Sequence, residues 1–318
     1  MSSFDSVNYS LRPSKNIERK LVFEFLRQLQ AVLQIQDYRY IGFGSMWFVD
    51  FILAHRLLSI RSMVSMEKPE YAERAEFNRP FSCIKVEPGE STEVLPTLGL
   101  QVQESIFWLD YDSGLEGPCL QDLTYIVENA KAGSIVIVTL NAHKGRLPEN
   151  DSDGNPINLE TSLRQLAGDA VPASLSARSF QAKAFPATLA AVLRNHLNHV
   201  VRMAARGLRF VPILNLSYQD NAPMITIGGV LADEAQQAVL AAQKFEGWGD
   251  FAYSEEPHII DAPPLTLREK LALDRLMPSE HAPSDADVRR LGFGLKERQR
   301  VAYHRFYRLY PMFGEVDV

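Results

Sequence analysis

This chain has few cysteines, no long apolar run and no surplus of basic residues. Its 318 residues include 2 cysteines, Cys83 and Cys119, which form no CxxC pair and have no histidine close by in the sequence. A structural zinc site and a disulfide are therefore not expected. No apolar stretch approaches bilayer length, and Met1 to Ser10 lack a signal-peptide pattern. These absences favour a cytoplasmic protein without membrane contact.

The charge balance is acidic, with a formal net charge of −6 at pH 7. Proteins that bind nucleic acids mainly through phosphates usually carry a basic surplus. Hydrophobic residues make up 46% and charged residues 23% of the chain, which is ordinary for a globular protein with a substantial core. Nucleic acid is therefore a disfavoured partner, although a local basic patch is considered below.

Apolar runs that alternate with helical patterns dominate the first half of the chain. A first helix is predicted over residues 14–35, with Ser14 as its N-cap. Five β-rich runs follow it, at 38–41, 62–66, 82–86, 105–109 and 134–140. Such alternation indicates parallel strands joined by crossover helices. Two further runs, 208–217 and 224–230, flank a polar turn with a proline and predict an antiparallel hairpin.

The order of these patterns predicts three parts. Residues 1–35 would form an N-terminal arm and helix, and residues 36–244 would form the α/β domain. Residues 245–318, with helices expected near 266–276 and 295–309, would form a helical extension packed on that domain. The expected sheet is doubly wound and mostly parallel, with seven strands and an antiparallel last strand.

A glycine turn lies at the junction of the first strand and the following helix. Gly42 and Gly44 permit a tight turn there, and the helix start offers unpaired N–H groups to a ligand. Glu67 ends the next predicted strand, close to the spacing at which an acid binds ribose hydroxyls in nucleotide folds. Together they predict a nucleotide-type cofactor site.

Four strand-end motifs now carry a resemblance to a known family. They are Tyr40-Ile-Gly-Phe-Gly-Ser45, Met66-Glu67, Gly89-Glu-Ser-Thr-Glu-Val-Leu-Pro96 and Phe107-Trp-Leu-Asp110. Over about residues 36–230 the chain resembles the class I S-adenosylmethionine-dependent methyltransferases, in an O-methyltransferase-like form. The resemblance implies S-adenosylmethionine as the cofactor and a Rossmann-like sheet.

The same resemblance implies roles for individual residues. Gly42 and Gly44, with Ser45 in the same turn, would line the methionine and ribose portion of the cofactor, and Glu67 would take the ribose hydroxyls. Two acidic strand-end regions complete the implied site. Glu90 or Ser91 would lie beside the adenine, and Asp110 would face the methionine end and the methyl acceptor.

Asp110 and Asp112 could lie on one side of an extended segment and act as general bases or bind a hard cation. Asn141 and His143 follow the fifth strand, so the four loosely resemble the metal-binding set of some small-molecule O-methyltransferases. We favour the alternative, in which one aspartate orients the cofactor and no metal is bound.

Cys119, next to a proline, lies too far beyond the fourth strand to resemble a cytosine-methyltransferase nucleophile, and we expect it to be buried and inert.

The two ends of the chain carry basic residues among aromatics. Tyr9, Arg12 and Lys15 either touch an anionic group at the site or belong to a solvated arm. The last predicted helix interleaves arginines such as Arg298 and Arg305 with aromatic residues. Stacking and phosphate pairing would suit nucleic acid, but we favour contact with a protein partner or packing through Val301, Phe306, Tyr307 and Tyr310.

Three functions compete at this stage. The first is methyl transfer to an unidentified acceptor (a small molecule, nucleotide or protein), and the second is a catalytically inactive methyltransferase-like subunit that scaffolds a complex. The third, a nicotinamide-dependent oxidoreductase, would prefer GxGxxG, and the third residue after Gly44 is Trp47. Methyl transfer is therefore the preferred interpretation.

Overall fold

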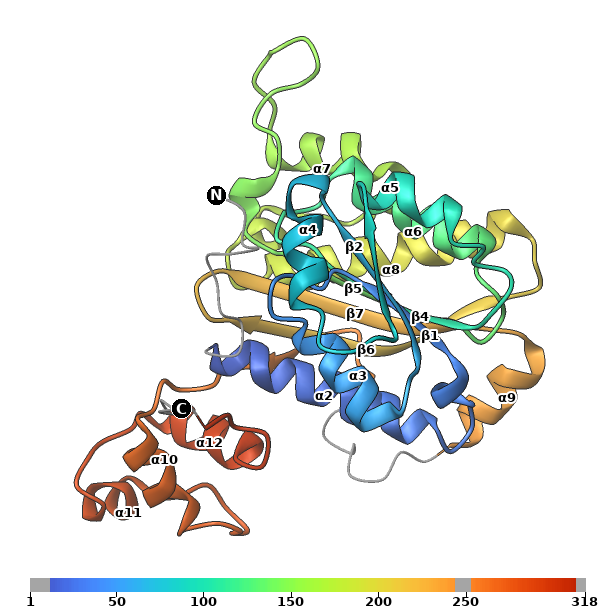
Figure 1. The fold of residues 1–318 in the computed structure, drawn as a ribbon. Coiled ribbons are helices and arrows are strands. Elements are labelled where there is room, and N and C mark those ends of the chain that lie inside the picture. The colour runs from blue at the N-terminus through green and yellow to red at the C-terminus, as the bar shows by residue number, and fades with distance from the viewer. Residues whose placement is uncertain (1–11, 244–252, 313–318) are drawn as a thin grey trace.

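The computed structural model describes residues 12–243 and 253–312, and its centre is an eight-stranded sheet (Figure 1). The strand order is β3-β2-β1-β4-β5-β7-β6-β8. In chain order the strands are β1 Arg39–Gly42, β2 Ser62–Glu67, β3 Ile84–Pro88, β4 Ser105–Asp110, β5 Ile135–Asn141, β6 Arg209–Gln219, β7 Pro223–Ala232 and β8 His258–Ile260. This is the predicted Rossmann-like methyltransferase fold.

The sheet is parallel except around β7, which pairs antiparallel with both β5 and β6. The predicted hairpin is therefore confirmed. The expectation of seven strands is wrong by one, because β8 adds at the edge and pairs parallel with β6, with Leu216 opposite His258. A strand of three residues is too short to show the alternation of apolar and polar residues by which strands are predicted from sequence.

Helices cover both faces of the sheet (Figure 1). One face carries α2 Pro13–Leu29, α3 Val49–Leu58 and α4 Pro69–Asn78. The other carries α5 Ser91–Val94, α6 Gly117–Asn129, α7 Leu159–Ala167 and α8 Phe185–Ala204, and α9 Glu234–Ala242 follows the hairpin. Among the described residues, no helix combines the length and the apolar character needed to cross a membrane.

Strand β4 shows how the sequence supplies two cores from one run of apolar residues. Ile106 and Trp108 pack in the layer under α2 and α3, and Phe107 and Leu109 pack in the layer under α6 and α8. Successive side chains of a strand point to opposite faces, so an uninterrupted apolar run suits a strand covered on both sides. Asp110 ends this run at the carboxyl edge of the sheet.

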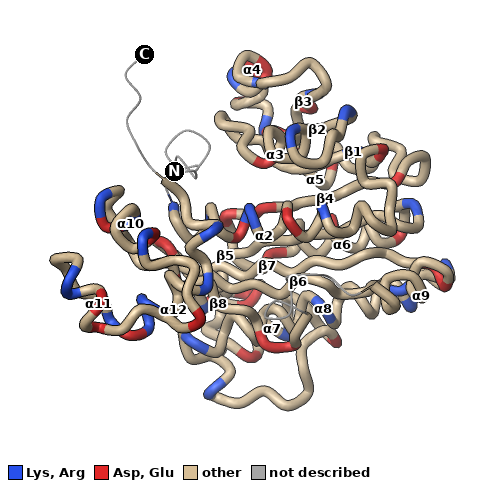
Figure 2. The backbone as a smooth tube through the Cα atoms, turned by 90° about the horizontal axis from the view of Figure 1, so that it is seen from below, with Lys and Arg blue, Asp and Glu red and all other residues tan. Residues whose placement is uncertain are grey.

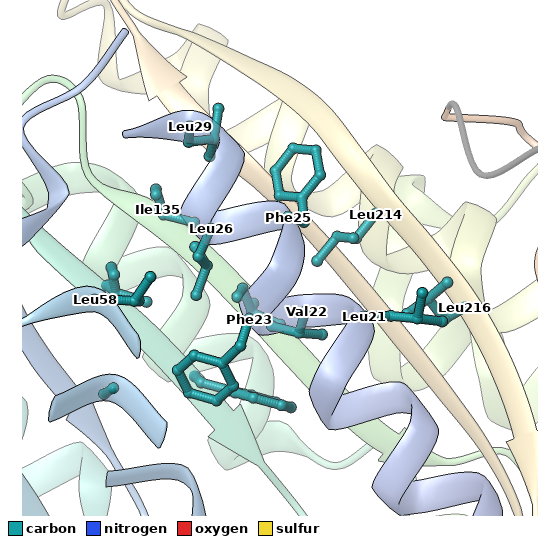
Figure 3. Packing of buried hydrophobic residues seen from close by; sticks show 14 of the residues in the cluster. Leu21, Val22, Phe23, Phe25, Leu26, Leu29, Leu58, Ile135, Leu214 and Leu216 are labelled. Carbon is teal, nitrogen blue, oxygen red and sulfur yellow. The ribbon is translucent and has the colours of Figure 1, made fainter. Parts of the chain in front are cut away.

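Helix α2 packs its apolar residues against the sheet, and Figure 3 shows them pointing toward Leu214 and Leu216 of β6 and Ile135 of β5. The expected span of 14–35 is too long, since the helix ends at Leu29. Its N-cap is Arg12 rather than Ser14, because Pro13 occupies the first turn.

The start of α2 is held by a carboxylate from another element. The backbone N–H groups of Ser14 and Lys15 donate to the two side-chain oxygens of Asp220, each at 3.0 Å. Asp220 lies in the turn between β6 and β7, so this bond fixes the first turn of α2 at the carboxyl edge of the sheet. An acidic group at a helix N-terminus also favours the helix dipole.

The C-terminal extension contains α10 Leu267–Asp274, α11 Asp285–Arg290 and α12 Glu297–Phe306. Tyr303, Phe306 and Tyr310 are buried and belong to the same apolar cluster as α2. Packing by Phe306 and Tyr310 is thus confirmed, but Val301, also expected to pack, is 51% exposed. Figure 2 shows basic and acidic residues mixed along α10 to α12 rather than a surface of one sign.

Candidate active site

The centre of the sheet is a switch point between β1 and β4. From β1 the strand order runs outward through β2 and β3, and from β4 it runs the other way through β5. The loops that follow β1 and β4 therefore diverge toward α3 and α6 on opposite faces, and the crevice in which open α/β sheets bind ligands is expected at these carboxyl ends. β1 ends at Gly42 and β4 ends at Asp110.

The turn after β1 accepts only glycine at two positions. A Cβ on Gly42 would lie 2.7 Å from the backbone oxygen of Trp108, and one on Gly44 would lie 2.6 Å from the ring of Phe48. Phe48 is fully buried beneath the turn, so its ring has little room to move. The two glycines therefore let the turn pack directly against β4 and the Phe48 ring.

Glu67 at the end of β2 holds this turn. Its Oε1 accepts hydrogen bonds from the N–H of Gly44 at 2.8 Å, the N–H of Ser45 at 3.0 Å and the hydroxyl of Ser65 at 2.8 Å. Burial raises the pKa of Glu67, and these three bonds oppose the rise. The structure thus brings Gly44, Ser45 and Glu67 together, as the sequence predicted. A hydrogen-bond donor of a ligand would share Oε1 of Glu67 or use Oε2.

The predicted adenine side is built differently from the expectation. Ser91 is buried and its hydroxyl donates to the carboxylate of Asp122 in α6, which also accepts from the hydroxyl of Tyr111. Glu90 points outward and its carboxylate lies 3.5 Å from the Nζ of Lys68. Asp122 was not foreseen, and the available signal was a carboxylate on the apolar face of a predicted helix.

Asp110 lies beside a lysine from the first helix. The Nζ of Lys15 lies 2.7 Å from Oδ2 of Asp110 and 3.2 Å from Oε2 of Glu18. It also lies 5.3 Å from the ring centroid of Trp108 and 5.4 Å from that of Tyr218. Burial would lower the pKa of Lys15, but Asp110 and Glu18 outweigh it and raise that pKa well above its usual range.

A chain of buried polar groups connects this cluster to the sheet. The hydroxyl of Thr226 donates to Oε1 of Glu18 at 2.7 Å, and the hydroxyls of Thr226 and Thr139 lie 2.9 Å apart. The indole N–H of Trp108 donates to Thr139 at 3.1 Å. Burial raises the pKa of Glu18, and Lys15 opposes that rise. Three strands and α2 are thus joined through one buried network.

A second buried ion pair lies one turn further along α2. The Nε of Arg19 donates to Oδ1 of Asp50 at 2.6 Å, linking α2 to the first turn of α3. Burial would lower the pKa of Arg19, but the neighbouring carboxylates, Asp50 foremost, raise it. Arginine stays charged in either case, so the pair fixes how the two helices meet beside the crevice.

The other residues considered for a metal site lie in the loops that follow β4 and β5. Asp112 is exposed, and the exposed His143 uses Nδ1 to accept from the N–H of Gly145. The amide oxygen of Asn141 accepts from the N–H of His143 at 3.0 Å. Across residues 12–243 and 253–312, no group of three or more His, Cys, Asp or Glu side chains could hold a metal ion. Metal independence stays a prediction.

Two remaining predictions concern Cys119 and the N-terminal arm. Cys119 is buried as expected, and burial raises the pKa of its thiol, with Asp122 adding to the effect. Tyr9 lies outside the described residues. Lys15 does not belong to a solvated arm, because it is buried against Asp110 and Glu18, partners that were not foreseen. Contact between Lys15 and an anionic group of a ligand stays a prediction.

Comparisons with known proteins identify a matching family and several similar structures. The model of a family described as "Putative O-methyltransferase" matches residues 7–318. No curated protein matches the sequence. Solved structures similar to the chain include Trm1 from Pyrococcus horikoshii with S-adenosyl-L-methionine, at 12% identity and a TM-score of 0.45, covering 71% of this chain and 57% of that one. Human N-acetylserotonin methyltransferase with its cofactor shares 14% identity at a TM-score of 0.33, covering 69% and 56%. The chain spans just over half the length of these two structures.

Proposed function

Since the chain belongs to this O-methyltransferase family, we propose that it transfers a methyl group from S-adenosylmethionine to an oxygen atom of an acceptor. The observation that carries the proposal is the turn between Gly42 and Ser45, held by Glu67 and shaped so that a Cβ on Gly44 would meet the Phe48 ring at 2.6 Å. A glycine turn at a sheet switch point, with a carboxylate held beside it, is the arrangement at which open α/β sheets bind nucleotides.

The residues of the crevice fit the cofactor's chemistry. Glu67, which the N–H groups of the turn hold in place, supplies carboxylate oxygens for the two ribose hydroxyls. Ser91 and Asp122 bound the adenine side, and Asp110 bounds the methionine side. When bound, the sulfonium supplies an electrophilic methyl group, and the protein's part is to hold the donor and exclude water.

The test is calorimetric titration of S-adenosylmethionine into three proteins: wild type, Gly44→Ala and Gly294→Ala. A Cβ on Gly294 meets no atom within 4 Å, so that variant is the matched control for adding a methyl group to the chain. We expect wild type and Gly294→Ala to bind alike and Gly44→Ala to bind at least tenfold more weakly. Wild-type protein that does not bind the cofactor would refute the proposal.

A second measurement separates an enzyme from an inactive binding subunit. Incubation with methyl-labelled S-adenosylmethionine and a pooled small-molecule extract should give a labelled product whose methyl group is released by ether or ester cleavage. Cofactor binding without transfer to any extract fraction would favour the scaffold function over the enzymatic one.

A further inference from the structure

Lys15 is an unusual residue to find in the core. It is among the largest side chains that are fully buried, on a helix whose neighbouring positions are filled by Ile17, Leu21 and Val22. Burying an ammonium costs several kcal/mol before its partners compensate, and an apolar side chain would pack here at no such cost. A buried charge at the carboxyl edge of the sheet therefore indicates a function beyond packing.

The exposure of its partners shows where the cluster can act. The Lys15 and Glu18 side chains are 2% and 0% exposed, whereas the Asp110 side chain is 18% exposed. Of these three, Asp110 is the one that a ligand can touch. Lys15 lies 2.7 Å from Oδ2 of that carboxylate, so Oδ1 is the oxygen left to accept a bond from a ligand.

We propose that Lys15 is a positioning residue, which orients the Asp110 carboxylate so that it binds the α-ammonium group of the cofactor's amino-acid portion. The inference rests on the proposed function, because it assumes that the crevice takes S-adenosylmethionine. It makes α2, which lies outside the alternating strand and helix units, a necessary part of the cofactor site.

The charges around the cluster support a cationic partner. Lys15 and Arg19 bring two formal positive charges, and Glu18, Asp50 and Asp110 bring three negative ones, so the sum is −1. An ammonium at the exposed carboxylate of Asp110 would add a positive charge beside the acidic members of this cluster. The hydroxyls of Tyr40 and Tyr218 also face it, and burial raises the pKa of both, so they add no charge at neutral pH.

The experiment compares two ligands that differ in the amino-acid portion. S-adenosylhomocysteine carries it and 5′-methylthioadenosine lacks it, while both have a neutral thioether sulfur. We expect Lys15→Met and Asp110→Asn each to lower the affinity for S-adenosylhomocysteine by roughly tenfold or more, because each variant loses one charge-assisted hydrogen bond to the ligand. Binding of 5′-methylthioadenosine should change by less than about twofold, since it makes no such bond.

Three controls separate positioning from general damage. Lys15→Arg should restore most of the affinity because it keeps the charge, and the Lys15→Met, Asp110→Asn double variant should be no weaker than the weaker single one. Lys20→Met, from the same helix, should leave both affinities unchanged, because the Lys20 Nζ donates to the backbone oxygen of Leu309 in the C-terminal extension. Melting temperatures of all variants show whether each is folded.

The outcomes are distinct. Equal loss of both ligands in Lys15→Met, or additive losses in the double variant, would overturn the positioning role and leave a structural one. If Lys15→Met does not fold, Asp110→Asn decides: unchanged affinity for S-adenosylhomocysteine overturns the proposal. Wild-type protein that binds neither S-adenosylmethionine nor S-adenosylhomocysteine would refute the proposed function itself.

Discussion

Removing the Glu67 side chain should lower both the stability of the protein, through the glycine turn, and its affinity for S-adenosylmethionine. In Glu67→Ala the N–H of Ser45 loses its acceptor, while the N–H of Gly44 keeps the hydroxyl of Ser65 at 2.9 Å. One stranded amide and the lost charge-assisted bonds cost about 2–4 kcal/mol, and relief of the buried charge, visible in the raised pKa, offsets part of it. We expect a net loss of about 1–3 kcal/mol in the free energy of unfolding.

Urea denaturation measures that loss, and Glu67→Gln is the matched control. The glutamine Oε1 can still accept from the turn, so its stability should stay within about 1 kcal/mol of wild type. Both variants should have a lower affinity for S-adenosylmethionine, because the ribose hydroxyls lose a carboxylate acceptor. For Glu67→Ala the loss of affinity should be roughly ten- to a hundredfold. A Glu67→Ala protein with wild-type stability and wild-type affinity would show that Glu67 neither holds the turn nor binds the ligand.

Further predictions concern the C-terminal extension, the thiols and pH. Phe306→Ala should lower the free energy of unfolding by about 3–5 kcal/mol, because Phe306 is buried. The exposed Arg305 should cost under about 1 kcal/mol when replaced by alanine, and the retention of RNA on a filter should not change. A salt-dependent loss of RNA retention in Arg305→Ala would instead indicate a nucleic-acid surface. With a thiol reagent at pH 8, the half-buried Cys83 should react in native protein and Cys119 only after unfolding; two fast thiols would contradict the burial. Burial lowers the pKa of His196, so the unfolded chain takes up its proton first as pH falls below about 6.5. His196 therefore lowers the free energy of unfolding from pH 7 to pH 5, so over that range wild type should lose more stability, or gain less, than His196→Asn; equal slopes would exclude this effect of His196.

The local patterns of the sequence carry much of the fold. Runs such as Ser105–Asp110 and Ile135–Asn141 are apolar over a strand's length and are separated by helical periodicity, so the strands and their parallel pairing follow from short-range chemistry. The glycine turn and Glu67 were also readable, because each lies at the end of a strand and parallel strands bring their ends to one edge.

Contacts between distant elements were not readable in the same way. Ser14 looks like an N-cap by its neighbours, yet Asp220 from the β6–β7 turn satisfies the start of the helix. The resemblance implies a place for Ser91 beside the adenine, but only the tertiary structure brings the Asp122 carboxylate to its hydroxyl. In each case the local preference is worth about 1 kcal/mol, and a buried partner from another element outweighs it.

The sequence by itself determined the order of strands and helices, the two apolar layers and the glycine turn at the end of β1, because these depend on periodicity and on neighbours within a few residues. Only the tertiary structure decided that Lys15 meets Asp110 and Glu18 inside the core. A buried charge needs an opposite charge within a few ångströms, and which residue provides it depends on how α2 packs across β4 and β6, since no sequence spacing encodes that distance.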